Sequence, residues 1–231
     1  MTIENLIRVV PPPAAPDEAY LGPWEAIEAD LGTPLPQDYK DFVRLYGCGD
    51  FMEFLGIHVP VFWSPYVRLQ SEVRVICDTL RDIQDRPYPL WPEPGGLLPF
   101  GKTDFGDYLL WLPRGPPDAW GVVVWDRGMG EFEAFDCGLT DFLAGLATGD
   151  IEPKEFPEDM LPCDRLFEPS PPCPAEHLNW RSDFLTGSFG GKTDVRVELG
   201  PQPVGDRPRV TLSPVSWRAS WRVSHNRRAP R

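Results

Sequence analysis

The chain has 231 residues, of which 42% are hydrophobic and 12% aromatic, so it can bury a sizeable core in one or two domains. Its net charge is −13, and a strongly acidic domain repels the phosphates of nucleic acid. No apolar run reaches the roughly 18 residues that a membrane helix needs. The first ten residues carry an acid and lead into prolines, unlike a signal peptide, so we expect a cytoplasmic protein without a membrane span.

In chain order, residues 2–16 are predicted to be an extended or disordered leader, because the run PPPAAP blocks a helix. A first helix is expected from Pro23 to the glycine stop at Gly32. A second begins at Pro36 and ends at a pair of glycines. Its apolar residues recur at helical spacing and are Tyr39, Phe42, Val43 and Tyr46.

Residues 51–61 are mostly apolar and are predicted to form a strand. The longest helix should start at Pro65, after a capping serine, and pack an apolar stripe on the sheet. A last short helix should follow Thr140 and Asp141, which can cap it. The stripe of the long helix consists of Tyr66, Leu69, Val73, Ile76, Leu80 and Ile83.

The centre of the chain, residues 97–136, is predicted to be an antiparallel meander. Segments rich in β-branched and aromatic residues mark its three strands, at residues 107–112, 120–125 and 131–135. A proline-rich connection and a glycine-containing hairpin turn separate them. We therefore expect an α+β fold in which a small antiparallel sheet carries helices on one face.

Charge is distributed unevenly along the chain. Residues 1–168 contain 30 acids and 12 bases, a net charge of −18, whereas residues 169–231 contain 5 acids and 10 bases, a net charge of +5. This distribution predicts an acidic domain followed by a basic extension. Acidity attracts basic partners but also keeps a protein soluble, and charge alone does not decide between the two roles.

Five cysteines are scattered without a CxxC pair, and only three histidines could join them as metal ligands. Disulfide frameworks and zinc sites need clustered cysteines. We therefore predict no metal and no cofactor, and interpret as structural or incidental thiols Cys48, Cys77, Cys137, Cys163 and Cys173.

Four segments resemble, in motif and in order, the Smi/Knr-type cell-wall-regulator domain of the SUKH superfamily. They are LGTPLPQDYKDFVRLYGCGDF at residues 31–51, LLPFGKTDFGDYLLW at 97–111, AWGVVVWD at 119–126 and LTDFLAGL at 139–146. The resemblance implies a mixed α+β domain with helices on one face of a curved sheet. A longer proline-rich connection before Leu97 and the basic extension depart from the family pattern.

The resemblance also implies a function. Bacterial domains similar to this one mostly serve as immunity proteins that neutralise secreted polymorphic toxins, often nucleases or deaminases, and a similar fungal domain regulates cell-wall synthesis through protein contacts. Neither role is catalytic. We therefore predict a non-enzymatic protein that occludes the active site of a basic toxin domain such as a nuclease. The alternative is a regulatory or scaffold protein, and the oligomeric state stays open.

Two patterns that suggest an enzyme have structural explanations. Residues 96–103 match the phosphate-loop pattern GxxxxGK[ST], but Pro99 lies within the loop and a strand rather than a helix follows. We interpret residues 96–103 as a turn that enters the meander. The near-repeat at 187–193 is one residue short of the pattern and likewise has no helical pattern after it. Asp104 and Asp107 could be paired carboxylates, but we favour a structural interpretation, with Asp104 as a turn residue and Asp107 as the exposed first residue of a strand.

A nucleophile–base pair is not indicated either. His58, His177 and Ser64 have no sequence relation that brings them together. His58 lies in an apolar strand, which favours a packed histidine over a catalytic base. We predict no catalytic residue.

A partner site is predicted around the tryptophan at the end of the second meander strand. Alternation makes both faces of this strand apolar, so one face could present Trp125 within a rim of acids. The leader or the C-terminal extension could instead cover it. The predicted partner-binding residues are Asp104, Asp107, Trp125, Asp126, Glu131 and Glu133.

The remainder of the chain is proline-rich and then basic. Residues 153–174 hold seven prolines and are predicted to be a linker, and VRVEL at 195–199 could add a strand. The arginines and tryptophans near the end could contact nucleic acid or acidic membranes, fold back on the acidic domain, or stay disordered. The predicted division is a leader at 1–21, a Smi/Knr-like (SUKH) domain at 22–151 and a linker with extension at 152–231.

Overall fold

The computed structural model describes residues 3–16, 20–60, 62, 64–154, 156–157, 160–163 and 165–170. The predictions for the basic extension, the strand at 195–199 and the near-repeat at 187–193 therefore lie outside the described residues, as do those for His177 and Cys173.

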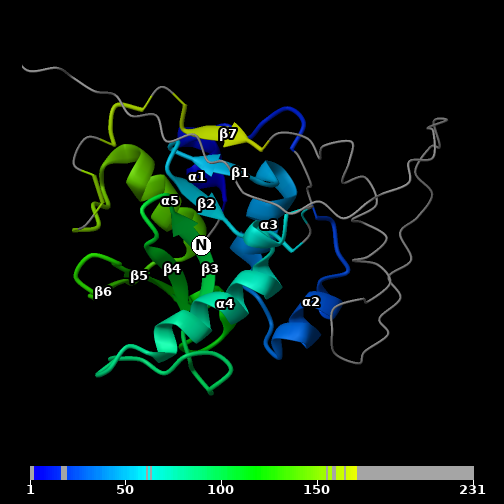
Figure 1. Ribbon diagram of the computed structural model, residues 1–231. Coiled ribbons are helices and arrows are strands. Elements are labelled where there is room, and N and C mark those ends of the chain that lie inside the picture. Colours follow the sequence, from blue (N-terminus) through cyan, green and yellow to red (C-terminus); the bar gives the residue numbers. More distant parts are fainter. Residues whose placement is uncertain are drawn as a thin grey trace, which may run out of the picture. The chain divides into compact units, whose positions relative to one another are not determined.

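An antiparallel sheet forms the centre of the described part of the chain (Figure 1). Its strand order is β6-β5-β4-β3-β2-β1-β7, so consecutive strands from β1 to β6 are neighbours and β7 adds to the far edge. The strands are β1 (Gly49–Phe51), β2 (Leu55–Ile57), β3 (Leu98–Thr103), β4 (Tyr108–Leu112), β5 (Gly121–Trp125), β6 (Phe132–Phe135) and β7 (Phe167–Pro169).

The predicted meander is confirmed as β4, β5 and β6, each within one residue of the expected start. Two neighbouring predictions are wrong in detail. The strand expected at 51–61 is a hairpin of β1 and β2, because a tight turn divides it. The phosphate-loop-like string at 96–103 forms β3, paired with β2 and β4, rather than a turn.

Helices surround the sheet: α1 (Glu4–Val9), α2 (Trp24–Leu31), α3 (Gln37–Tyr46), α4 (Leu69–Arg81) and α5 (Leu139–Thr148). Gly32 ends α2 in the left-handed conformation, with φ 69°, as a C-terminal glycine should. The long helix starts later than predicted, because residues Pro65–Val67 form a separate 3₁₀ turn and α4 begins after Arg68.

One face of the sheet packs against α3 and α5. The ring of Trp111 in β4 lies 5.0 Å from that of Tyr39 in α3, measured between centroids. Phe135 of β6, which shares this face through the cross-strand pairs, lies 5.1 Å from Phe142 of α5.

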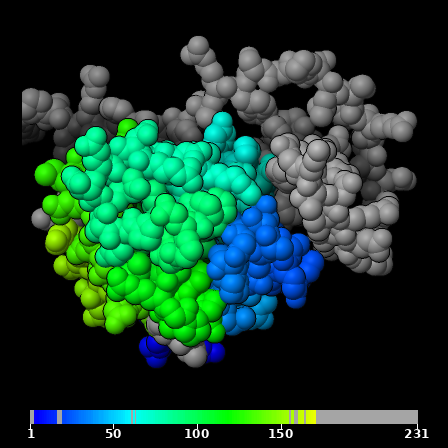
Figure 2. All heavy atoms as spheres, turned by 90° about the horizontal axis from the view of Figure 1, so that it is seen from below, coloured from blue at the N-terminus to red at the C-terminus, as the bar shows by residue number. Residues whose placement is uncertain are grey.

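The opposite face packs against α4. Lys102 of β3 pairs with Tyr108, three residues before Trp111, so alternation places Lys102 on the face away from α3. Its Nζ lies 2.8 Å from Oε2 of Glu72 in α4. In Figure 2 the segment from α4 towards β3, coloured cyan to green, forms a continuous surface beside the blue α2. The α+β class with an antiparallel sheet is confirmed, and the helices extend over more of the sheet than the single face expected.

The leader prediction is wrong for residues 4–10, because α1 is a helix that completes the core. Leu6 is 0% exposed and Val10 is 1% exposed. The Tyr46 hydroxyl donates a hydrogen bond to the Val10 carbonyl, and Asn5 donates one to Asp141 of α5. Six residues are too few for a stable isolated helix, so packing on α5 supplies the stability that α1 lacks alone.

The start of α5 is held by a residue from another helix. Gly138 is its N-cap, and Thr140 and Asp141 lie inside the first turn, so the expected local cap is wrong. Instead Asp38 of α3, which is buried, accepts hydrogen bonds from the Thr140 N–H (3.1 Å) and hydroxyl (3.3 Å). Burial raises the pKa of Asp38, and the bonds from Thr140 oppose that rise.

The linker prediction is wrong at residues 167–169. These residues form β7 and pair with β1, and the ring of Phe167 lies 5.3 Å from that of Tyr46. Phe156, a described residue between α5 and β7, is also buried, so both it and β7 belong to the folded unit. Among the described residues, no helix is both long and apolar enough to cross a membrane.

Candidate functional site

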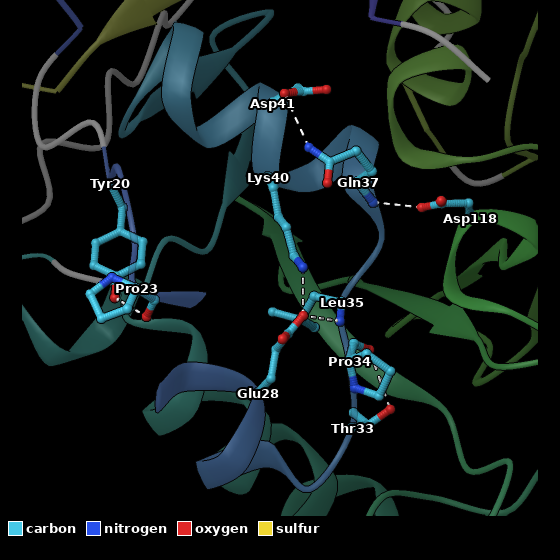
Figure 3. Close-up of polar contacts among 10 residues, drawn as sticks. All are labelled: Tyr20, Pro23, Glu28, Thr33, Pro34, Leu35, Gln37, Lys40, Asp41 and Asp118. Atoms are coloured by element: carbon cyan, nitrogen blue, oxygen red, sulfur yellow. Dashed lines mark hydrogen bonds and ion pairs between the residues drawn. The ribbon is translucent and has the colours of Figure 1, made fainter. Parts of the chain in front are cut away.

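Two hollows on the described surface are candidates for a binding site. The first, of about 380 Å³, lies between the segment at residues 20–24 with α2 and the facing side of α3. In Figure 3 the side chain of Lys40 points from α3 towards Glu28 of α2. The Lys40 Nζ lies 2.6 Å from the Glu28 Oε1, and it also lies 5.8 Å from the ring centroid of Trp24.

The charges of the first hollow mainly hold the fold together. Glu28 accepts the Leu35 N–H at 2.8 Å as well as Lys40, so it joins α2, the following loop and α3. Burial alone would raise the pKa of Glu28, but the hydrogen bonds from Lys40 and Leu35 outweigh it and lower the pKa. Arg44 is similarly paired with Asp41 at 3.0 Å. Both bases of this hollow are thus neutralised within it.

The second hollow lies at one end of the sheet. It is lined by the β1–β2 turn, by Phe105 of the β3–β4 turn, and by Pro157, Met160, Pro162 and Cys163. Antiparallel order places the turns between β1 and β2, β3 and β4, and β5 and β6 at one end. We call this surface the hairpin end and define it as residues 52–54, 104–107 and 126–131.

Hydrogen bonds join the three turns of the hairpin end. The Asp104 N–H donates to the Phe54 carbonyl at 3.0 Å, and the Arg127 N–H donates to Oδ1 of Asp107 at 3.0 Å. The Met52 N–H donates to the Leu166 carbonyl at 2.9 Å, which attaches the chain that enters β7. The hairpin end is therefore a continuous and preorganised surface rather than three independent loops.

All six residues predicted for partner binding lie at or beside the hairpin end, but three of them are buried. Asp107 accepts the Thr103 hydroxyl at 2.7 Å in addition to Arg127, so the expectation of an exposed strand residue is wrong. Asp126 caps its own turn by accepting the Gly128 and Met129 N–H groups. Their carboxylates organise the turns.

Trp125 is also buried. It is 7% exposed and stacks on Tyr108, with ring centroids 5.0 Å apart, so the expectation of an exposed aromatic anchor at this position is wrong. Asp104 and Glu131 are exposed, and half-buried Glu133 accepts the Lys154 N–H at 2.9 Å. A role of these three acids in partner binding stays a prediction.

The exposed aromatic residue of the hairpin end is Phe105, which the sequence interpretation missed. Phe105 is 63% exposed at the tip of the turn between β3 and β4. It borders the second hollow, of about 360 Å³, together with Met52, Phe54 and Met160. The signal was present in TDFGDY, where a large apolar residue stands between two turn-forming positions, Asp104 and Gly106.

Acidic side chains crowd this end of the sheet. Asp50 of β1 has a raised pKa, first because of burial and then because of repulsion by Asp104 and Glu168. Burial likewise raises the pKa of Asp104. Within the described part of the chain, Asp50, Glu53, Asp104 and Glu131 form no ion pair, whereas Glu168 pairs with Arg165 at 2.7 Å.

The histidine considered as a base in the sequence analysis is enclosed. His58 is 1% exposed, and burial, with a smaller contribution from Lys102, lowers its pKa to about 3. It therefore cannot reach a substrate without local unfolding. Among the described residues, no group of three or more His, Cys, Asp or Glu side chains is placed so that it could hold a metal ion.

Comparison with known proteins gives a family match. The family model SUKH_6, described as SMI1-KNR4 cell-wall, matches residues 22–143, slightly more than half of the chain. No curated protein and no solved structure matches. The matched region runs from the residues before α2 to the first half of α5 and includes the whole hairpin end.

Proposed function

This chain belongs to the SMI1-KNR4 cell-wall family, and we propose that it is a non-enzymatic protein that binds a basic protein partner through the hairpin end. More specifically, we propose that it is a cytoplasmic immunity protein that neutralises a bacterial toxin by occluding the toxin's active site. A basic toxin domain such as a nuclease is the partner that this function requires.

The observation that carries the proposal is the combination of exposed Phe105 with nearby acids that form no ion pair within the described residues. Exposed aromatic residues are typical anchors of protein interfaces, and charges around them steer the partner. Because Asp50 and Asp104 repel each other, a partner that brings cations next to them gains Coulomb energy and relieves that repulsion. An acidic surface also disfavours direct contact with nucleic acid.

The non-enzymatic part of the proposal has its own support. In the first hollow the bases are committed to Glu28 and Asp41, and at the hairpin end two carboxylates organise backbone turns. His58 is enclosed. These are structural uses of the groups from which an acid–base site would be built.

The test compares the whole protein with a charge-reversed variant of the hairpin end, Glu53→Lys with Asp104→Lys. Its matched control is Asp82→Lys with Glu93→Lys, which changes the net charge equally at exposed sites after α4. Each protein is used to capture partners from cells of the source organism, at low and high salt, with identification by mass spectrometry.

We expect the whole protein and the control to retain one stoichiometric basic toxin-like protein. High salt should weaken its binding, because dissolved ions screen the electrostatic attraction and reduce its range. The hairpin variant should lose at least about tenfold in affinity for the purified partner. Co-expression should protect cells from that toxin. Capture of cell-wall or signalling proteins instead would favour the regulatory alternative, and equal capture by the hairpin variant would contradict the site.

A further inference from the structure

We propose that the hollow at the hairpin end receives one apolar side chain from a basic segment of the partner, while lysine or arginine residues on both sides of it pair with Glu53 and Asp104. This inference rests on the proposed function, because it names the chemistry of the partner segment that the same surface would bind.

Part of the wall of the hollow suits an apolar side chain. Phe54 forms its fixed part, because its ring contacts Phe156 at 5.1 Å and Phe105 at 5.5 Å between centroids. Met52 and Met160 add unbranched, polarizable side chains, which adapt to ligands of different shape. Phe105 leaves most of its surface in water, so covering it is favourable.

The chain alternates wall and rim at two of the three turns. Met52, a wall residue, is followed by the exposed Glu53, which also lines the hollow, and Phe105 is preceded by the exposed Asp104. An apolar side chain seated between these walls therefore brings its own neighbours next to carboxylates. A segment in which basic residues flank an apolar one can place the apolar side chain against the wall and its basic side chains next to the carboxylates of Glu53 and Asp104.

Charge argues against two other occupants, an acidic segment and a second copy of this chain. An acidic segment would add to the repulsion that already raises the pKa of Asp50. A second copy of this chain is disfavoured for the same reason, because residues 1–168 carry a net charge of −18. The backbone of the turn is consistent with a binding role: Met52 and Glu53 both have positive φ, 54° and 56°, although neither is glycine or asparagine.

The test uses labelled synthetic peptides and the whole protein. The first peptide has a central leucine with two lysines on each side, the second has alanine in place of the leucine, and the third has glutamates in place of the lysines. Binding is measured by fluorescence anisotropy at low and high salt. The protein variants are Phe105→Ala and, as the matched control, Leu21→Ala, which removes another exposed apolar side chain, one that lines the first hollow rather than the second. Urea unfolding verifies that each variant folds.

We expect the leucine peptide to bind the whole protein about tenfold more tightly than the alanine peptide, and Phe105→Ala to reduce this ratio to about twofold or less. Leu21→Ala should leave the ratio unchanged, and the glutamate peptide should not bind. Equal binding of the leucine and alanine peptides, no binding of either, or equal losses in both variants would overturn the proposal.

Cys163 provides an independent readout of position, since it lines the hollow and is partly exposed. The leucine peptide should slow alkylation of Cys163, measured by mass spectrometry, and leave the partly exposed Cys137 unaffected. Unchanged alkylation of Cys163 would place the peptide elsewhere and contradict the hollow. If Phe105→Ala still binds the captured cellular partner with wild-type affinity, the proposal for the hollow is contradicted but the proposed function is not. If the peptides behave as expected but no toxin is captured, the proposed binding site in the hollow is supported and the proposed immunity function is contradicted.

Discussion

His58 illustrates how a single buried residue links the fold to pH. Its backbone N–H donates to the Phe100 carbonyl at 2.8 Å, but neither ring nitrogen has a hydrogen-bond partner among the described residues. Burial and then the charge of Lys102 lower its pKa from 6.5 to about 3. The folded protein thus keeps the ring neutral at pH values where the unfolded chain protonates it.

This predicts that stability falls as the pH is lowered from about 6.5 towards 3, because the unfolded state then binds a proton that the folded state does not. The loss is at most about 1.4 kcal/mol per pH unit. His58→Leu should remove this component and, at pH 7.5, leave the free energy of unfolding equal or higher, since no unpaired nitrogens remain buried. Urea unfolding across this pH range measures both effects.

His58→Gln is the matched control for that measurement. It removes the titrating group but keeps polar atoms in the same apolar surroundings, so it should lose the pH dependence and be less stable than His58→Leu at every pH. Identical pH profiles for the wild type and His58→Leu would show that other groups cause the acid sensitivity.

The element that departs most from local preference is the β1–β2 turn. The Phe54 N–H donates to the Phe51 carbonyl, and positive φ at both residues between them is the pattern of a type I′ turn. Such turns prefer Asn-Gly, because glycine has no Cβ and asparagine tolerates the left-handed conformation, whereas most other side chains are strained there. Met52 and Glu53 occupy these positions instead, and both line the hollow. Their contribution to binding would explain why strained side chains stand where glycine or asparagine would be more stable.

Glu53→Gly should therefore raise the free energy of unfolding by about 0.5–1 kcal/mol, the relief of strain less the extra entropy that glycine loses on folding. The same substitution should weaken binding of a basic partner, because it removes a rim carboxylate. Chemical unfolding and partner titration measure the two effects. Glu53→Gln is the control: if it stabilises the protein as much as glycine does, charge rather than backbone strain is responsible.

At the scale of the whole molecule, the folded unit extends beyond the family match on both sides. Residues 22–143 match the family, yet α1 before them and β7 after them belong to the same fold. Leu6 of α1 is wholly buried, and the Tyr46 hydroxyl of α3 reaches the backbone just after α1. The core of the family domain is thus incomplete without the N-terminal residues.

Leu6→Ala should consequently lower the free energy of unfolding by about 2–5 kcal/mol, the range for a cavity left by a buried leucine. Val75→Ala on the exposed side of α4 is the control and should change it by less than about 0.5 kcal/mol. Thermal and urea unfolding supply the values. A Leu6→Ala protein as stable as the control would mean that α1 contributes nothing to the core.

Local patterns in the amino-acid sequence were sufficient for α2, α3, most of α4 and the strands β4 to β6. In each of these elements, helical spacing, alternation or a terminal glycine encodes the structure within a few neighbouring residues. The family resemblance also came from such short motifs, because they mark turns and strand starts. The acidic character of a possible interface followed from composition alone.

Only the tertiary structure decided which segments complete the fold and which acids are available. The short α1 and β7 depend on partners distant in sequence, respectively α5 and β1, so no local pattern reveals them. Asp104 and Asp107 are alike in sequence, but one is exposed and the other is buried under two hydrogen bonds. Phe105 rather than Trp125 is the exposed ring. Which ring is buried depends on the surfaces that meet when the sheet packs against its helices. A sequence specifies those contacts only through the complete fold.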